Sequence, residues 1–308
     1  DDEPAFVVLD LPGRGKGAIA SRDIKRGELL IREQPLFLVP DRITGSPTDF
    51  ILSRVRALSP TQSQSFYDLS YVNLPQNLSP EEHAKQLPLA IFQTNAVAAG
   101  QGVGLFPRMA RLNHACSHAF NSIYSWRDDE GVLVVYALKD IKQSEELLTT
   151  YTNTKRPRAE RRCFLQQNYD FYCVCACCAQ SEAGSWASDR RLGAMAALYA
   201  RLAEWGNGAI DGWEAIGLVR RIWDVGEEEG YHSERGRLAA DAMLVAAAHS
   251  DAEAVVRWAR LAERWSTYEL GADSALAKEA RRVALSPGSH EMWGGRERMR
   301  VGGPEGRA

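Results

Sequence analysis

Five of the six cysteines in this 308-residue chain lie in two short segments. The segments are Cys173-Val-Cys175-Ala-Cys177-Cys178 and Asn113-His114-Ala115-Cys116. Cys173, Cys175 and Cys178 have C-x-C-x-x-C spacing, so three thiolates can converge from one tight turn. Zinc prefers four ligands in a tetrahedron, and Cys116 is the natural candidate for the fourth. Cys177 adjoins Cys178 and cannot easily share the ion, so we expect it beside the site or free.

A cluster of disulfides is the alternative interpretation of the same cysteines. Disulfides are typical of secreted proteins, yet nothing at the N-terminus resembles a hydrophobic signal segment. No stretch is apolar and long enough to span a membrane, and six cysteines are few for 308 residues. These observations favour zinc.

A glycine-rich loop near the N-terminus is the second candidate for chemistry. In Gly13-Arg14-Gly15-Lys16-Gly17, alternate glycines let the backbone approach a ligand, and the two cations can meet a carboxylate or phosphate. The loop matches neither the Walker nor the dinucleotide pattern, because no helix start follows at the required spacing. Taken alone, a plain β-turn with exposed basic residues is the better interpretation.

Other residues that could take part in binding or catalysis also have ordinary structural explanations when each is considered alone. Taken alone, Tyr151 is expected to be a core residue at the end of a strand, and Phe171 is expected to be an ordinary residue of the hydrophobic core. His114 reads as a hydrogen-bonded structural histidine, and Asn113 as a turn residue. Their meaning therefore depends on the order in which they occur together.

Length and composition describe an ordinary globular chain. About two domains are expected for 308 residues, of which 45% are hydrophobic and 25% charged. A net charge of −3 shows no overall preference for nucleic acid or anionic membrane. The basic run at residues 155–162 reads as a solvated face, because no aromatic residues interleave its charges as stacking platforms.

The part of the chain before about residue 181 alternates β-rich runs with Gly and Pro turns, which predicts many short strands. Within it, helical spacing indicates an inserted subdomain over about residues 41–99, whose second helix starts at Ser59-Pro60. Strands are expected at residues 6–9, 29–31, 36–39, 122–126 and 132–137, and helices at 48–58, 61–71 and 87–99.

The remainder of the chain is alanine-rich with helical periodicity. Antiparallel helices are expected at residues 190–205, 213–229, 233–249, 252–266 and 274–285, as a tetratricopeptide-like stack or an irregular bundle. Residues 286–308 are rich in Gly, Pro and Arg, which predicts a mobile tail.

Four motifs in sequence order give the chain a family resemblance. The glycine-rich loop, Arg111-Leu-Asn113-His114-Ala-Cys116, Glu145-Glu-Leu-Leu-Thr-Thr-Tyr151 and the cysteine cluster after Phe171-Tyr172 resemble SET-domain protein lysine methyltransferases. The resemblance is closest to the SET-and-MYND branch and its fungal relatives, and it covers about residues 3–180. The MYND zinc module itself is missing, because too few cysteines exist to build it.

The resemblance implies an α+β fold in several parts. Residues 1–180 would form a β-rich SET domain with the helical insert and a post-SET zinc segment at 163–180. Residues 181–285 would form the all-α C-terminal domain. In the family, the segment at residues 113–116 passes beneath the loop before the C-terminal cysteines, and zinc would lock this threading.

The resemblance also implies a pocket for S-adenosylmethionine. Its floor would be the glycine-rich loop, and Phe171 would stack on the adenine. The residues implied to contact this cofactor are Arg14, Gly15, Lys16, Asn95, Asn113, His114, Tyr151 and Phe171.

Cys116, Cys173, Cys175 and Cys178 match the family's zinc ligands, in agreement with the spacing argument. Methyl transfer needs a neutral, well-placed amine in a shaped cavity from which water is excluded. The Tyr151 hydroxyl would orient the lysine as the main catalytic residue, and Tyr169 would form the wall of the lysine channel.

The chain departs from the family pattern at two places. The Pro-Asn pair expected after Cys116 is His118-Ala119, with Asn121 two positions late, and Ser144 replaces the usual Gly before the Glu-Glu pair. A catalytically weak or inactive scaffold that binds a partner peptide through its helical domain is therefore the second hypothesis. Redox sensing by Cys177 or Cys163 is a third, and it requires an exposed thiol of low pKa.

The implied partner is a protein or peptide that contains the target lysine, on a histone or another protein. We expect no direct binding of nucleic acid, no membrane association, a monomer, and residence in the nucleus, the cytoplasm or both. The substrate and the number of methyl groups added do not follow from these residues.

Overall fold

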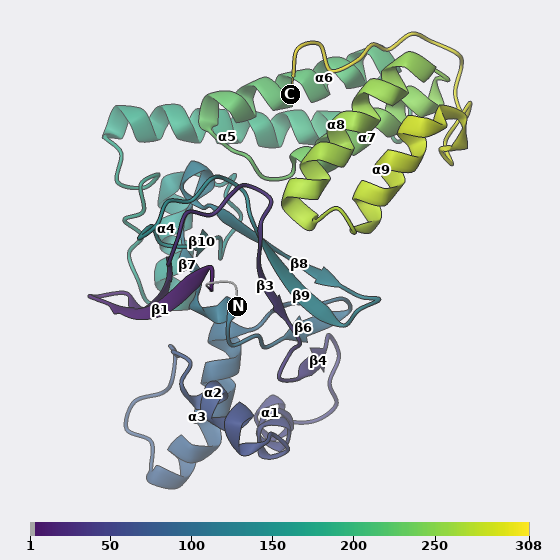
Figure 1. Cartoon of the computed structure of the whole chain (residues 1–308). Helices are drawn as coiled ribbons and strands as arrows, with labels where there is room; N and C mark the ends of the chain where they lie inside the picture. Colours follow the sequence, from purple (N-terminus) through teal and green to yellow (C-terminus); the bar gives the residue numbers. More distant parts are fainter. Residues whose placement is uncertain (1–3, 308) are drawn as a thin grey trace.

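A computed structural model describes residues 4–307 of the chain. A β-rich body lies between a small group of helices, α1–α3, and a larger layer of helices, α5–α9 (Figure 1). Among the described residues, no helix combines the length and hydrophobicity needed to cross a bilayer. The predicted α+β architecture is confirmed.

The β-rich body consists of small sheets. Strand β9 is the centre of one of them, in the order β3-β9-β8. Every residue of Val132-Leu-Val-Val-Tyr-Ala137 is buried, because one face of the strand belongs to the core of the body and helix α8 packs near the strand. The strands are β1 (Phe6–Leu11) with β2 (Gly15–Ala20), β3 (Leu29–Glu33) with β9 (Val132–Ala137) and β8 (Ser122–Arg127), β4 (Leu38–Pro40) with β6 (Gly102–Gly104) and β5 (Val97–Ala98), and β7 (Asn113–His114) with β10 (Leu148–Thr149).

The parallel pair β7–β10 is the feature of the body that matters most for the site. It joins Leu148 to Asn113 and Thr149 to His114. The segment before Tyr151 therefore runs alongside the segment before Cys116, although more than 30 residues separate them in sequence.

The helical insert follows β4 and returns to the body at β5. Ser46, Ser59 and Ser79 each cap a helix that begins with proline, which places a hydroxyl acceptor and a residue without N–H where they fit best. The helices are α1 (Pro47–Arg56), α2 (Pro60–Tyr67) and α3 (Pro80–Asn95).

The third helix of the insert differs from its predicted bounds of 87–99. It begins seven residues earlier, because Ser79 and Glu82 form a reciprocal capping box. It ends at Asn95, since Val97 and Ala98 pair with β6 as strand β5. Tertiary pairing overrides the helical spacing there.

The C-terminal helices pack in antiparallel neighbours, as the periodicity predicted. Helix α5 begins at Glu182 rather than at residue 190, because Ser181 caps it ahead of the first apolar residues. Fully buried alanines such as Ala239, Ala242 and Ala246 allow close packing around α7. The helices are α5 (Glu182–Ala203), α6 (Gly212–Glu229), α7 (Arg235–Ala248), α8 (Ala252–Leu270) and α9 (Ala275–Leu285).

The segment after α9 is bound along this bundle, in contrast to the mobile tail that we predicted. The Asp251 carboxylate accepts the backbone N–H of Val301 at 2.8 Å, and the Trp258 indole donates to the carbonyl of Gly302 at 3.0 Å. Arg307 pairs with Asp224 at 2.7 Å. These contacts could not be predicted from the glycine-rich composition, because they are made by backbone groups and single charged side chains rather than by an apolar face.

Candidate functional site

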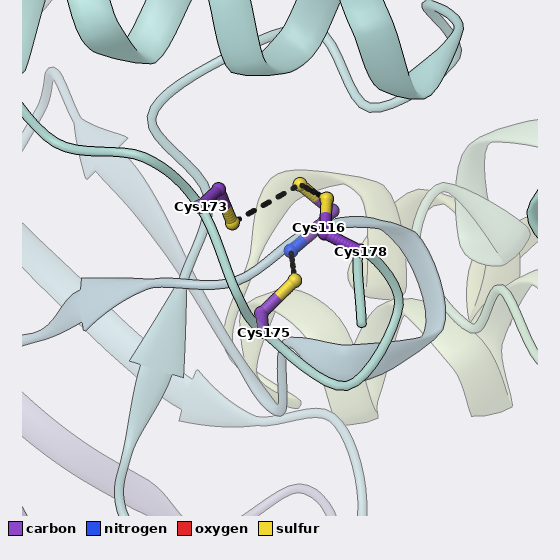
Figure 2. A group of neighbouring side chains, drawn as sticks. All are labelled: Cys116, Cys173, Cys175 and Cys178. Atoms are coloured by element: carbon purple, nitrogen blue, oxygen red, sulfur yellow. Dashed lines mark hydrogen bonds between the residues drawn. The ribbon is translucent and has the colours of Figure 1, made fainter. Parts of the chain in front are cut away.

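Cys116, Cys173, Cys175 and Cys178 come together between the β-rich body and the helical layer (Figure 2). Their sulfur atoms all lie within 4.8 Å of one another. The Sγ atom of Cys116 is 3.6 Å from that of Cys178 and 4.0 Å from that of Cys173. Tetrahedral zinc with Zn–S bonds of about 2.3 Å needs sulfurs about 3.8 Å apart. The four thiols therefore fit a zinc ion.

The basic run before this cluster holds the cysteine loop in place. Helix α4 (Arg158–Tyr169), which the sequence reasoning missed, carries Arg161, a residue only 1% exposed. Its guanidinium lies 3.6 Å from Cys177 Sγ and 3.9 Å from Cys178 Sγ, while Arg162 donates to the carbonyls of Cys173 and Cys178. The prediction of a solvated face is wrong for these residues. Their positive charge suits the net −2 charge of a zinc tetrathiolate.

Cys177 lies outside the group of four cysteines, as expected. It is buried, and its burial raises the pKa of the thiol to about 12. It therefore lacks the exposed, acidic thiol that redox sensing requires. Cys163 is exposed and lies apart from the cluster.

His114 lies directly between the cysteine cluster and Tyr151. Its Nδ1 accepts the backbone N–H of Tyr151 at 2.9 Å, and its Nε2 is 3.1 Å from Cys116 Sγ. Burial lowers the pKa of His114 to about 4, so the ring is neutral. Since Nδ1 is the acceptor, Nε2 carries the proton and points it at the sulfur. Such outer hydrogen bonds fix the orientation of a metal ligand.

A cavity of about 550 Å³ opens over the glycine-rich turn, and we call it the loop-side cavity. Among the residues predicted to bind cofactor, six line it: Arg14, Gly15, Asn113, His114, Tyr151 and Phe171. Asn113 is held there by its amide, which donates to Glu146 at 2.9 Å and to the carbonyl of Lys16 at 3.3 Å. Arg14 pairs with Glu146 at 2.7 Å.

Two of the residues predicted to contact the cofactor, Lys16 and Asn95, do not line the loop-side cavity. The ammonium of Lys16 pairs with Asp68 at 2.7 Å and lies away from the loop-side cavity, because successive side chains of strand β2 point to opposite faces. Asn95 donates to the carbonyls of Ser70 and Ile91, both at 2.7 Å, and lines a different cavity. Its amide closes the end of α3 instead.

The second cavity, of about 450 Å³, is bordered by the end of the helical insert, and we call it the insert-side cavity. Both cavities are lined by Tyr151 and Tyr169, whose ring centroids are 4.9 Å apart. The Tyr151 hydroxyl donates to the carbonyl of Leu112 at 2.8 Å. Burial, with Tyr169 nearby, raises the pKa of Tyr151 well above its usual range, so the phenol remains a protonated donor.

Several lining residues were not found from the sequence. Ser70 and Leu148 border the loop-side cavity, whereas Tyr124 and Arg156 border the insert-side cavity. Leu148 lies within the motif that ends at Tyr151 and Arg156 within the basic run, but neither was assigned to a cavity, and Ser70 and Tyr124 belong to no motif. The folding of the insert and of β8 against the body brings Ser70 and Tyr124 to the site, whereas Leu148 arrives on β10 and Arg156 on the segment before α4.

The departures at residues 118–121 have structural roles. The Asn121 side chain donates to the carbonyl of Glu146 at 2.9 Å and accepts the N–H of Leu148 at 2.8 Å, so it holds β10 beside β8. His118 Nδ1 lies 3.4 Å from the buried carboxylate of Glu229 at the end of α6. This contact ties the cysteine segment to the helical domain.

The other departure, Ser144, occupies a strained position. Its φ angle is +70°, in the left-handed region where glycine is favoured. The usual Gly at this place is therefore explained by the backbone. Ser144 keeps the same turn at a cost of about 1 kcal/mol.

Comparison with known proteins agrees with this geometry. Residues 15–152 match the family model described as the SET domain. The chain therefore contains a SET domain. Its relatives include both fungal Set5 proteins and SMYD proteins, so the predicted resemblance to the SET-and-MYND branch and its fungal relatives is confirmed.

Three of these relatives show the extent of the similarity. Histone-lysine N-methyltransferase set5 of Schizosaccharomyces pombe is 28% identical over 178 residues, or 58% of this chain and 51% of that protein. Histone-lysine N-methyltransferase SMYD3 of Homo sapiens is 32% identical over 98 residues, or 32% of this chain and 22% of that protein. Protein-lysine N-trimethyltransferase SMYD5 of Mus musculus is 37% identical over 81 residues, or 25% of this chain and 19% of that protein. The aligned parts span about half of these proteins or less.

Proposed function

We propose that the chain transfers methyl groups from S-adenosylmethionine to lysine side chains of a protein substrate. The single observation that carries the proposal is the pair of cavities that share Tyr151 and Tyr169. A cofactor in the loop-side cavity and a lysine in the insert-side cavity would meet between these two phenols. The SET domain and the relatives named as lysine methyltransferases support the same activity.

The residues around the two cavities suit these separate roles, one cavity for the cofactor and the other for the lysine. S-adenosylmethionine supplies an electrophilic methyl group on a sulfonium centre. Asn113 and Phe171 would hold that cofactor, with Arg14 near its amino-acid end. Tyr151, fixed through Leu112 and His114, would orient the attacking nitrogen. Aromatic walls favour the uncharged amine that attack requires, because a charged ammonium loses its hydration there.

Isothermal titration of the zinc-loaded protein with S-adenosylmethionine tests the first half of the proposal. Incubation with radiolabelled cofactor and either histone octamers or lysine-centred peptide mixtures tests the second half. We expect cofactor binding and label on lysine. Absence of cofactor binding contradicts the enzymatic function, whereas binding without transfer to any acceptor would favour the scaffold hypothesis. Monomeric state and nuclear or cytoplasmic residence stay predictions.

A further inference from the structure

The segment that follows Tyr151, residues 153–156, connects the insert-side cavity with the helical domain. Asn153 and Arg156 line the cavity, whereas Lys155 contacts the helices. The Lys155 ammonium lies 2.6 Å from Glu234 and above the rings of Tyr199 and Tyr231, at 5.1 and 5.2 Å from their centroids. Lys155 is thus enclosed by one carboxylate and two aromatic faces.

This enclosure is rigid on the side of the helical domain. Tyr231 is 4% exposed, and its ring packs edge-on against Phe120 at 6.0 Å. The buried hydroxyl of Thr154 donates to the Tyr231 hydroxyl at 3.2 Å. A partly desolvated ammonium gains more from aromatic faces than an exposed one. The helical domain therefore fixes the direction in which the next residue, Arg156, leaves the segment.

Among residues 4–307, Arg156 is the only charged one that lines the insert-side cavity. Its guanidinium lies 5.7 Å from the centroid of Phe164, which lines the same cavity. None of the salt bridges formed within residues 4–307 involves Arg156, and its side chain is exposed. The guanidinium thus remains available at the cavity mouth, supported by an aromatic wall.

We infer that Arg156 determines specificity by binding a carboxylate close to the target lysine of the substrate, and that Lys155 positions it. This inference rests on the proposed function. A guanidinium pairs with a carboxylate through two parallel N–H donors. The lining of the cavity contains no Asp or Glu to attract a second cation. The favoured acceptor is therefore a lysine next to Asp or Glu rather than one within a basic tail.

Two peptide mixtures test the inference, and every peptide in them contains a single lysine. The Glu mixture has Glu at the three positions on either side of that lysine, the Arg mixture has Arg at the same positions, and the two are otherwise identical. For the zinc-loaded wild-type chain we expect kcat/KM to be about tenfold higher with the Glu mixture, an effect that added salt weakens. The R156E variant should reverse the preference, and R156K should keep part of it.

The positioning role of Lys155 has its own readout. K155M should bring the ratio of the two kcat/KM values towards unity with unchanged affinity for S-adenosylmethionine, and K155R should restore the ratio. R190M, which removes an exposed guanidinium from the Trp186 face of α5, is the control and should change neither quantity.

Equal rates with the two mixtures, or a ratio that R156E leaves unchanged, would overturn the inference while the proposed function stands. An unchanged ratio in K155M would remove Lys155 from the positioning role. Failure of both mixtures to accept methyl groups would count against the proposed function itself, and the inference would fall with it.

Discussion

The backbone N–H of Tyr151 donates a hydrogen bond of 2.9 Å to Nδ1 of His114. The other ring nitrogen of His114 faces Cys116 Sγ at 3.1 Å. A single imidazole therefore connects the cysteine cluster with the residue proposed to orient the substrate. The candidate zinc centre and the proposed methyl-transfer site are therefore physically connected. The first four predictions depend on this connection or on the cavity beside it.

Removal of zinc should abolish cofactor binding as well as local folding. Cys173 and Cys175 themselves line the loop-side cavity, and Phe171 lies in the same segment, two residues before Cys173. Chelation, or C173S, should therefore eliminate the heat of binding in titration with S-adenosylmethionine. C163S, at an exposed cysteine outside the cluster, is the control. Undiminished affinity in zinc-free protein would show that the cluster does not support the cavity.

Replacement of Tyr151 by Phe should lower kcat by about 100-fold or more, because the lost hydroxyl orients the reacting amine. Cofactor affinity should stay within about twofold, since the ring itself is retained. Single-turnover kinetics together with titration measure the two quantities. Y67F, which changes an exposed tyrosine at the end of α2, should have no effect. An unchanged kcat in Y151F would remove Tyr151 from the catalytic role.

Arg161 should contribute to zinc affinity. Its buried guanidinium faces Cys177 and Cys178, so R161M removes a buried positive charge from beside the negative tetrathiolate. We expect zinc affinity to fall by about 10- to 100-fold, the range found for outer partners of metal ligands. Competition with a chromophoric chelator measures it. R190M serves again as the matched exposed arginine, and equal zinc retention by both variants would argue against this role.

Gly17 should be required for the shape of the loop-side cavity. A Cβ atom at this position would lie 2.9 Å from the Asn113 amide nitrogen and would overlap with Leu11 Cδ1. G17A should therefore displace Asn113 and weaken cofactor binding by at least tenfold. Gly193 in α5 has nothing within 4 Å of the corresponding position, so G193A should instead stabilise the fold by about 1 kcal/mol. Unaltered binding in G17A would mean that Asn113 contributes little.

His232 should make the stability of the helical domain depend on pH. Burial, with Arg235, Lys139 and Arg26 nearby, lowers its pKa in the folded chain from 6.5 to about 4. The unfolded chain then binds more protons than the folded chain between these values, so the stability provided by neutral His232 is lost as pH falls from 6.5 to 4. Urea unfolding at several pH values should show a shallower loss in H232Q than in wild type.

H83Q, which changes an exposed histidine of α3, is the control for the pH series. Acid also displaces zinc from thiolates in every variant. The informative quantity is therefore the difference between the slopes of H232Q and wild type, and identical slopes would contradict the assignment.

Much of the fold was predictable because its signals are local. The serine caps at Ser59 and Ser274, the apolar spacing of α6–α9 and the continuous apolar run of β9 are each written within a few consecutive residues. Strand β2 and helix α4 were missed. The first is built from alternating glycines, and the second from a charged run whose partners are the backbone and sulfur atoms of the cysteine loop.

The site residues also fall into those that local sequence identified correctly and those whose position depends on the tertiary structure. Spacing selected Cys116, Cys173, Cys175 and Cys178, since three close thiols need one distant partner, and the ordered motifs selected Asn113, His114, Tyr151 and Phe171. The sequence placed Lys16 and Asn95 at the cofactor, but strand alternation turns Lys16 towards Asp68, and the end of α3 turns Asn95 to the other cavity.

The sequence by itself determined the identities of the residues that can do chemistry and most of the elements that carry them, because thiol spacing, caps and periodicity are properties of neighbouring residues. Only the tertiary structure decided that Tyr151 and Tyr169 separate two cavities and that His114 joins Tyr151 to Cys116. It also decided that Lys155 contacts the helical domain while Arg156 lines the insert-side cavity. Each of these relations joins segments distant in sequence, and their positions are fixed by packing and strand pairing rather than by local preference.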